Sequence, residues 1–368
     1  MNGLTDPGVA FVGLGYASQA LHLPAVRALA GASVVSGVDP DAARPRSWEP
    51  SGAGPSNPTL AAMLEQVRPD VTIIAAPPQA HAELCVQALR AGSQVLCEKP
   101  FVEDLRQADL VLAVAAECGR HLAVNQEFRF MPIFSPLIQA IGRPGVGRPV
   151  FVSCVQFMDL APWEEKVPWR SAMPHRSLFE AGVHLLDLLQ AVAGRPPLTV
   201  SAHTSAGLDL ERKSDAIHLV TLDYGDGLLA QVTIDRLCKS GTRYLDLRVD
   251  CEHASLRASY GGRAYLQVGV KRAELPGLRL DYGREGLAWL ERGRRRRVLA
   301  RNARGAAARA TGALLAETVS AWRDGREPPV SGRSARDVLA LVEAAYRSAE
   351  TGERVELAED GSGRRAKA

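Results

Sequence analysis

The sequence lacks the features of a membrane protein or a secreted protein. No apolar run approaches the length of a transmembrane helix, and the N-terminus does not have the basic-then-apolar order of a signal peptide. The six cysteines form no Cys-x-x-Cys pair, and the eight histidines form no cluster with metal-ligand spacing. Cysteines without such spacing are typical of buried thiols in a reducing compartment. We therefore expect a cytoplasmic protein with no membrane partner, no disulfide framework and no catalytic metal.

The chain also lacks a strong charge of one sign, since its formal net charge is only +3. Positive charge is concentrated in residues 292–309, which contain eight arginines and no acidic residue. Such a cluster can bind nucleic acid. However, no aromatic residues are interleaved with these arginines, and no recognition motif accompanies them. We interpret the segment as a solvated basic loop and predict no nucleic-acid partner.

The length and composition favour two globular domains. A chain of 368 residues exceeds the usual size of one hydrophobic core, and 46% hydrophobic with 23% charged residues is typical of globular proteins. The pattern of the sequence changes near residue 127. We therefore predict a first domain at 1–126 and a second at 127–357. The remaining residues, 358–368, are rich in glycine and charge and are expected to be frayed.

A glycine-rich turn follows the first apolar strand. The strand at 9–12 leads directly into Gly13 and Gly15, and residues 19–30 are typical of a helix. Gly13 would allow a tight turn and Gly15 would let the backbone approach a pyrophosphate, whose charge the helix N-terminus would bind. Ser18 stands at the third small position, where glycine is commoner. The pattern predicts a dinucleotide site.

An acidic residue ends the second strand, which is expected at 32–38. Asp39 can accept hydrogen bonds from the ribose hydroxyls of an adenosine. A carboxylate at this place repels a 2′-phosphate, which favours NAD over NADP as the cofactor. Arg44 and Arg46 lie just beyond it, and they keep NADP as the alternative.

Apolar strands then alternate with helices. Further strands are expected at 71–75, 94–97 and 121–125, with helices at 79–91 and 105–118. This alternation predicts a parallel sheet covered on both faces, which is the α/β class of the Rossmann fold. Lys99 follows the strand 94–97, at the edge of the sheet where such folds bind ligands. A lysine there can hydrogen-bond or protonate an oxygen.

Consecutive strands dominate the second half of the chain. They are expected at 149–157, 198–206, 217–224, 228–237, 244–251 and 254–260. Short connections between them predict a mostly antiparallel sheet, with helices at 177–193, 310–323 and 335–350 covering one face. The uncovered face would need a partner, so we expect a homodimer or homotetramer.

The helix expected at 177–193 carries a candidate proton-transfer group. Glu180 and His184 lie one helical turn apart, and Asp187 lies three residues further on. A histidine beside a carboxylate can exchange a proton near neutral pH while the carboxylate orients its ring. The alternative is a pair on the helix surface, or a histidine that is satisfied within the domain core.

Several short motifs occur in order along the chain. They are Gly13-Leu14-Gly15-Tyr16-Ala17 with His22, Ala76-Pro77-Pro78 with His81, Glu98-Lys99-Pro100, Asn125 with Arg129, Gly182-Val183-His184, and residues 343–349. In this order and spacing they resemble the Gfo/Idh/MocA superfamily (glucose–fructose oxidoreductase, inositol dehydrogenase and rhizopine catabolism). The resemblance covers nearly the whole chain. It implies a Rossmann domain, a second α/β domain with a large, open, mainly antiparallel sheet, and a cis peptide at Lys99-Pro100.

The resemblance also implies roles for individual residues. Lys99 and His184 are the catalytic positions, and Glu180 stands where aspartate is usual. The expected cofactor contacts are Gly13, Gly15, Tyr16, Ala17, Asp39, Pro77, His81, Glu98 and Asn125. The candidate substrate contacts are Arg129 and, from the irregular segment before Glu180, Trp163, Trp169, Arg170 and Arg176. Both tryptophans are equally compatible with a core between the domains.

We therefore predict an NAD(P)-dependent oxidoreductase that transfers a hydride between the nicotinamide and a carbinol or carbonyl carbon of a sugar, cyclitol or related polyol. Lys99 would hydrogen-bond the reacting oxygen, His184 would handle the proton, and Glu180 would orient His184. The alternatives are an NADPH-dependent ketosugar reductase, a glycosidase that recycles NAD, and a non-catalytic regulator that binds a dinucleotide.

Overall fold

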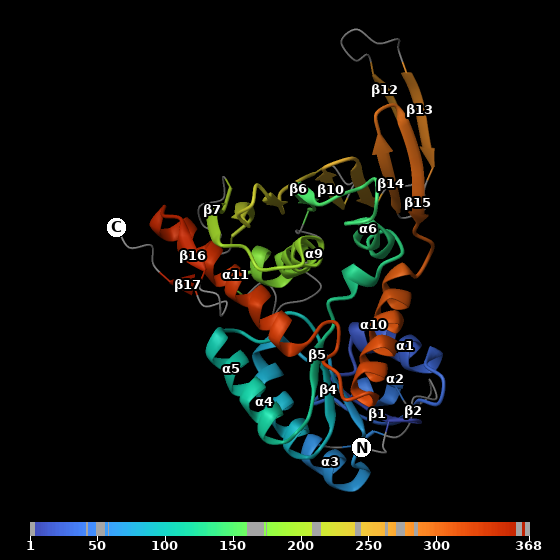
Figure 1. The fold of residues 1–368 in the computed structure, drawn as a ribbon. Helices are drawn as coiled ribbons and strands as arrows, with labels where there is room; N and C mark the ends of the chain where they lie inside the picture. The colour runs from blue at the N-terminus through green and yellow to red at the C-terminus, as the bar shows by residue number, and fades with distance from the viewer. Residues whose placement is uncertain are drawn as a thin grey trace. The chain divides into compact units, whose positions relative to one another are not determined.

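The structure is a computed structural model of the 368-residue chain (Figure 1). It describes residues 4–41, 43–48, 56–57, 59–159, 173, 175–207, 215–239, 244–261, 264–269, 277–282, 286–357 and 363–364. The chain divides into two compact units. The first consists of residues 1–130 and 307–340, and the second consists of residues 131–306 and 341–368.

The first unit is built on a five-stranded parallel sheet with the strand order β2-β1-β3-β4-β5. Its strands are β1 (Gly8–Val12), β2 (Ser33–Val38), β3 (Val71–Ile74), β4 (Gln94–Cys97) and β5 (Leu122–Val124). Every residue of β3, β4 and β5 is buried, as expected for strands covered on both faces. The chain passes from β1 to β2 on one side and then to β3 on the other, so the strand order reverses at β1. The predicted Rossmann class is confirmed for this unit.

Helices connect these strands, and one short helix follows the last of them. They are η1 (Ser18–His22), α1 (Leu23–Ala28), α2 (Ala43–Trp48), α3 (Leu60–Val67), α4 (Pro78–Arg90), α5 (Leu105–Glu117) and the 3₁₀ helix η3 (Glu127–Phe130). The single helix predicted at 19–30 is divided, because η1 is π-helical and α1 begins with a proline in its first turn. Thr59 and Asp104 cap α3 and α5 by accepting a backbone N–H.

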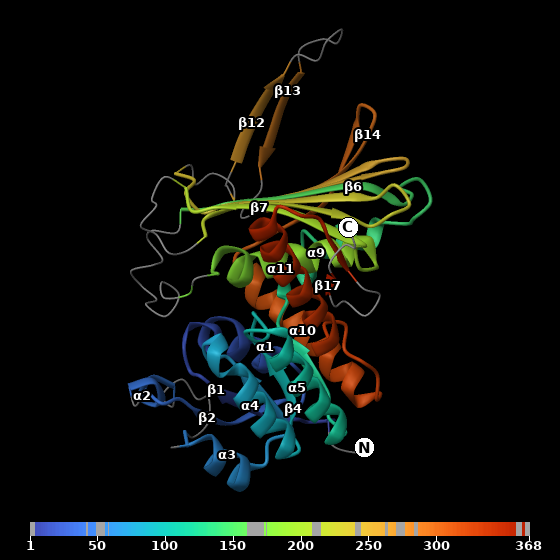
Figure 2. The same ribbon diagram turned by 90° about the vertical axis from the view of Figure 1, so that its left-hand side faces the viewer.

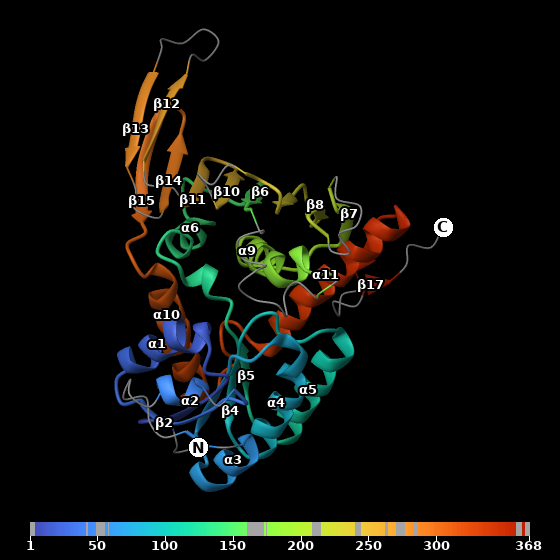
Figure 3. The same cartoon turned by 180° about the vertical axis from the view of Figure 1, so that it is seen from behind.

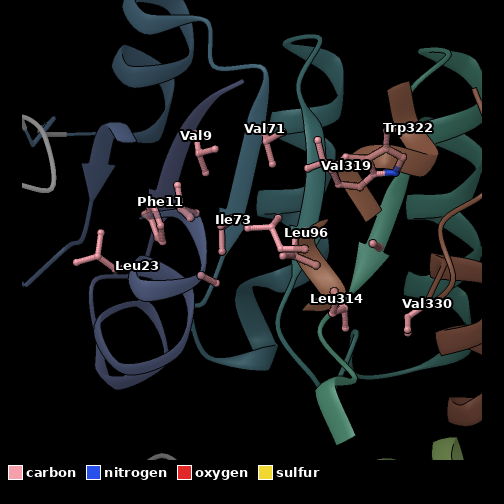
Figure 4. Close-up of a cluster of buried hydrophobic side chains, with 14 of the residues drawn as sticks. Val9, Phe11, Leu23, Val71, Ile73, Leu96, Leu314, Val319, Trp322 and Val330 are labelled. Carbon is pink, nitrogen blue, oxygen red and sulfur yellow. The ribbon is translucent and has the colours of Figure 1, made fainter. Parts of the chain in front are cut away.

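A helix from much later in the sequence completes the core of this unit. Helix α10 (Ala306–Arg323) buries Leu314, Val319 and Trp322 in the same cluster as Phe11 and Ile73 (Figure 4). Residues 307–340 therefore belong to the first compact unit, whereas the sequence assigned them to the second domain. The apolar pattern of a helix shows that one face is buried, but it does not show which core buries that face.

The second unit contains a ten-stranded sheet with the order β15-β14-β11-β10-β6-β9-β8-β7-β16-β17 (Figures 1 and 3). Its strands are β6 (Pro149–Phe157), β7 (Thr199–Ser205), β8 (Ile217–Asp223), β9 (Leu229–Asp235), β10 (Leu245–Cys251), β11 (Ser255–Tyr260), β14 (Gly286–Arg292), β15 (Arg295–Arg301), β16 (Val355–Leu357) and β17 (Gly363–Arg364). Neighbouring strands are antiparallel except for β6 and β9, which are parallel. The mostly antiparallel sheet predicted for this region is confirmed. Strands β12 (Ala264–Gly269) and β13 (Gly277–Tyr282) form a separate antiparallel pair.

Helices lie on one face of this sheet (Figure 2). They include α6 (Ser135–Ala140), the π-helix η4 (Ser177–Gly182), α9 (Val183–Ala193) and the later turns of α11 (Gly332–Thr351). Helix α9 packs against β6 and β9, and η4 packs against β8 and β9. The opposite face carries the exposed Phe157, Leu219 and Leu229, since their strand neighbours on the helix side are buried.

The arginine-rich segment is a strand rather than the solvated loop that the sequence predicted. Arg292 ends β14, and Arg295–Arg301 form β15, which is an edge strand of the sheet. Charged residues are common on edge strands, because they discourage pairing with another strand. The guanidinium of Arg296 lies 4.1 Å from the ring centre of Trp289, and it can make a cation–π contact there. In the predicted frayed tail, residues 363–364 pair with β16, and the other residues lie outside the described part of the chain.

Candidate active site

The candidate residues of the first unit follow the carboxyl ends of its parallel strands. Gly13 and Gly15 come after β1, Asp39 after β2, Lys99 after β4, and Asn125 after β5. Parallel strands place their carboxyl ends at one edge of a sheet, so these residues share that edge. This is the edge at which open α/β sheets bind ligands.

The glycine turn has the geometry that a dinucleotide site needs. Gly13 has φ +85°, and a Cβ at this position would lie 2.6 Å from the carbonyl oxygen of Ala75, so no other residue fits here. At Gly15 the nearest atom to an added Cβ is a guanidinium nitrogen of Arg44, at 3.7 Å. Ser18, which replaces the usual third glycine, donates its hydroxyl to the carbonyl oxygen of Gly13 at 2.5 Å. The serine at this position therefore stabilises the glycine turn by a hydrogen bond.

Asp39 is tied to the same turn. One carboxylate oxygen accepts the backbone N–H of Leu14 at 2.7 Å, and the other accepts that of Asp41 at 2.9 Å. A carboxylate has about four acceptor sites, so capacity remains for the hydroxyls of a ribose. Tyr16 is exposed and Ala17 is half-buried in the first turn of the following helix.

Glu98 is the centre of a buried polar cluster. Its Oε1 accepts hydrogen bonds from Nε2 of His22 at 2.7 Å and from the side-chain amide of Asn125 at 2.8 Å. Its Oε2 accepts the backbone N–H of Lys99 at 3.1 Å. Burial alone would raise the pKa of Glu98, but the hydrogen bond and charge of His22, with the charge of Lys99, lower it to about 2. The carboxylate is therefore ionised at neutral pH, and it fixes the backbone that carries Lys99.

His81 joins two loops at this edge. Its Nδ1 lies 2.9 Å from the carbonyl oxygen of Pro100, and its Nε2 lies 2.8 Å from that of Ala76. Burial lowers the pKa of His81, although the hydrogen bonds to these carbonyls act in the opposite direction. The ring thus connects the loop after β3, which includes Pro77, with the loop after β4. The Lys99-Pro100 peptide in that loop is cis, as the resemblance implied.

The arrangement fits a bound dinucleotide in two further ways. Oδ1 of the fully buried Asn125 has no hydrogen-bond donor among the described residues, so an acceptor is left for a ligand. Lys99 is only half-buried, and its ammonium group can therefore contact both protein and ligand. Arg129, on η3, donates to the carbonyl oxygen of Pro329 at 3.3 Å.

The second unit holds the predicted proton-transfer residues on one continuous helical segment. Glu180 is half-buried in η4, and His184 is the second residue of α9, only 4% exposed. Asp187 is buried one turn later. Arg176 is buried and precedes η4, where its backbone N–H bonds to Asp215 at 2.8 Å. Trp163, Trp169 and Arg170 lie outside the described residues.

The sequence reasoning missed three functional candidates. It did not connect His22 to Glu98, it gave Ser18 no role, and it passed over Asp215. A histidine on the buried side of the first helix was a signal for the first of these, because a buried histidine needs a polar partner. The Asp215 contacts had no local signal, since its partners lie far away in the sequence.

The described residues contain no group of three or more His, Cys, Asp or Glu side chains that could hold a metal ion. Within the same residues, no helix is long and apolar enough to cross a membrane.

Comparison with known proteins agrees with this geometry. The protein-family model described as "Oxidoreductase family, NAD-binding Rossmann fold" matches residues 8–126 of this chain. A second family model, "Oxidoreductase family, C-terminal alpha/beta domain", matches residues 146–357. The D-apiose dehydrogenase of Paraburkholderia graminis is 26% identical over 364 residues, covering 95% of this chain and 89% of that protein. The inositol 2-dehydrogenase of Streptomyces avermitilis is 29% identical over 316 residues, covering 79% and 85%.

Solved structures share the fold. An oxidoreductase from Agrobacterium radiobacter, crystallised with NAD+, L-tartaric acid and magnesium, has a TM-score of 0.79 at 20% identity. The match covers 96% of this chain and 98% of that one. The resemblance drawn from the motifs is thereby confirmed. The chain belongs to the Gfo/Idh/MocA family of oxidoreductases, and residues 8–126 form its NAD-binding Rossmann domain.

Proposed function

We propose that this oxidoreductase interconverts an alcohol and a carbonyl on a sugar, cyclitol or related polyol, with Lys99, His184 and Glu180 as its catalytic residues. The observation that carries the proposal is the place of Lys99, directly after β4 at the carboxyl edge of the NAD-binding sheet, on a backbone fixed by the buried Glu98 carboxylate. The substrate class is supported by the names of two relatives, a D-apiose dehydrogenase and an inositol 2-dehydrogenase.

The residues divide the chemistry between them. When bound, NAD supplies the hydride acceptor or donor. Lys99 donates a hydrogen bond to the reacting oxygen and stabilises the negative charge that develops on it. His184 takes the proton in the oxidation direction and returns it in the reduction direction, while Glu180 orients the imidazole. Glutamate is one methylene longer than the aspartate usual at this position, so we assign Glu180 to orientation and not to substrate binding.

The two predicted domains have separate binding roles in this proposal. We propose that residues 1–126 bind the dinucleotide through the contacts predicted above. Residues 127–357 would bind the substrate, with Arg129, Arg176 and the segment containing Trp163, Trp169 and Arg170 as contacts. We also propose a cytoplasmic protein, because Cys85, Cys97 and Cys154 are buried free thiols.

The test of this function is a panel of cyclitols, aldoses and nucleotide-linked ketosugars, assayed with NAD and with NADP by nicotinamide absorbance. Turnover of a polyol or sugar with NAD supports the proposal. Binding of NAD without turnover of any member of the panel supports a non-catalytic dinucleotide-binding regulator instead.

We expect Asp39→Ser to raise the KM for NAD by roughly 10- to 100-fold with a small change in kcat. The reason is that the carboxylate binds the ribose equally before and during the reaction, and a hydrogen bond to a charged group contributes about 1.5 to 3 kcal/mol. The KM for NADP should fall, because the repulsion of a 2′-phosphate is removed. Asp41→Ser is the matched control, since Asp41 is exposed and its carboxylate accepts from the Ala43 N–H and pairs with Arg44, whereas Asp39 accepts from the Leu14 N–H of the glycine turn. An unchanged KM for NAD in Asp39→Ser would refute the ribose role.

We propose that two or four copies of the chain assemble through the uncovered sheet face of the second unit. Phe157, Leu219 and Leu229 are 40 to 48% exposed on this face, where a partner would bury them. Light scattering of the purified protein should give at least twice the monomer mass. A monomer that persists at high protein concentration would contradict the assembly.

A further inference from the structure

The helical segment that carries Glu180 and His184 begins with backbone donors that the segment itself cannot satisfy. The first four N–H groups of a helix have no acceptor within it. Here they belong to Arg176, Ser177, Leu178 and Phe179, because the first internal bond runs from the Glu180 N–H to the Arg176 carbonyl, at 2.7 Å. No side chain at the N-cap position bonds to them. Their acceptors must therefore come from elsewhere.

Two distant side chains supply these acceptors. Oδ1 of Asp215 accepts the N–H groups of Arg176 at 2.8 Å and Ser177 at 2.9 Å. The oxygen of Tyr346, on α11, interacts with the backbone N–H groups of Leu178 and Phe179. In addition, the Ser177 hydroxyl donates to the carbonyl oxygen of Asp215 at 2.7 Å. Two of the four donors are thus hydrogen-bonded by Asp215, which lies 39 and 38 positions away along the chain, and the Tyr346 oxygen faces the other two.

The capping carboxylate is itself held by two donors. Its Oδ2 accepts from Nε2 of His218 at 2.7 Å and from the Tyr346 hydroxyl at 2.5 Å. Nδ1 of His218 lies 3.0 Å from the hydroxyl of Thr204, which fixes the ring from the other side. Within the described part of the chain, the titratable side chains that bond to Asp215 are therefore His218 on β8 and Tyr346 on α11. The ring of His175 also contacts the Tyr346 ring, tilted by 48° to it and with 4.4 Å between ring centres.

The carboxylate of Asp215 is ionised at neutral pH. Burial alone would raise the pKa of Asp215, but the hydrogen bonds and charge of His218, with the bond from Tyr346, lower it to about 2. A fixed negative charge at the N-terminus of a helix is favourable, because the helix dipole is positive there. A buried ionised cluster is nevertheless a poor way to gain stability, since apolar residues of the same volume often stabilise more. The cluster instead fixes the residue at which the helix begins.

We infer that Asp215, held by His218 and Tyr346, positions Glu180 and His184 for the reaction. The inference rests on the proposed function. Glu180 lies in the π-helical turn that Asp215 and Tyr346 anchor, and His184 follows that turn by two residues. A shift in the start of η4 rotates both side chains together, so the cap sets the direction of the imidazole. Asp215 is a positioning residue, because it acts through the helix and does not touch the substrate.

The experiment compares Asp215→Asn with wild type, using the substrate found in the panel. An asparagine can still accept from Arg176 and Ser177, but its amide group then faces the donors of His218 and Tyr346. We expect kcat to fall at least about tenfold while the KM for NAD stays within about twofold, measured well below the melting temperature of the variant. Tyr346→Phe should lower kcat in the same way. Asp223→Asn is the matched control, because Asp223 ends β8, the strand that follows Asp215, and accepts the backbone N–H of Gly225 instead.

A second measurement needs no substrate. We expect the amides of residues 177–184 to exchange hydrogen at least about tenfold faster in Asp215→Asn than in wild type, with no change in Asp223→Asn. If no substrate is turned over by wild type, the proposed function fails and the exchange result alone decides the positioning role. Wild-type kcat together with wild-type exchange in Asp215→Asn would overturn the inference. If Asp215→Asn does not fold, Tyr346→Phe decides by the same two measurements.

Discussion

The variant Lys99→Met is expected to lose roughly 10²- to 10⁴-fold in kcat/KM while its affinity for NAD stays close to that of wild type. Methionine keeps most of the length of the side chain and its apolar contacts, but it removes the three N–H donors of the ammonium group. The negative charge on the reacting oxygen then develops without a donor. The backbone at residue 99 should be unchanged, because it is held by Glu98 through the main-chain N–H.

Steady-state kinetics and NAD titration together check this expectation. The loss should appear in kcat, since the hydrogen bond strengthens as the oxygen gains charge. Lys239→Met is the control, because Lys239 is an exposed lysine that forms an ion pair with Asp159. It should turn over at the wild-type rate. If Lys99→Met also turns over at that rate, Lys99 is not the catalytic residue. If it loses NAD affinity in proportion to its activity, Lys99 serves in cofactor binding instead.

The sequence was most informative about the parallel sheet and its glycine turn. Each strand from β1 to β4 is a short, mostly apolar run next to a glycine or an acidic residue, and these signals are local. The positions of Gly13, Asp39 and Lys99 after their strands could therefore be read directly. The sequence also showed that Ser18 replaces the usual third glycine of the turn. Its hydrogen bond to the Gly13 carbonyl oxygen, however, is visible only in the structure.

The sequence could not supply the contacts that join distant segments. Helix α10 shows a clear apolar face, but its burial with Phe11 and Ile73 depends on tertiary packing. Strand β15 was missed because Arg295 to Arg297 break the alternation that marks a strand, and only an edge position tolerates them. Asp215 could not be identified from the sequence either, since no motif near it indicates that it accepts the backbone N–H groups of Arg176 and Ser177.

The variant Glu98→Gln is expected to lower the free energy of unfolding at pH 7 by roughly 2 to 4 kcal/mol. The carboxylate of Glu98 accepts from three donors, those of His22, Asn125 and Lys99. A glutamine has one acceptor oxygen and one amide group. If the oxygen faces His22 and Asn125, the amide opposes the Lys99 N–H; in the reverse orientation it opposes the other two. The melting temperature should fall by roughly 5 to 15 °C in a domain of this size.

The effect of pH separates a charge effect from a packing effect. The pKa of Glu98 in the folded protein is about 2, below its ordinary value of 4.5. Its ionisation therefore stabilises the fold above about pH 4.5, and this stabilisation is lost as the pH falls toward 2. The difference in melting temperature between wild type and Glu98→Gln should accordingly shrink between pH 5 and pH 3. Glu83→Gln, on the exposed side of α4, should melt like wild type at every pH. A difference that is the same at pH 3 and pH 7 would mean that Glu98 contributes by its shape, and the ionised cluster would then not be what holds the backbone of Lys99.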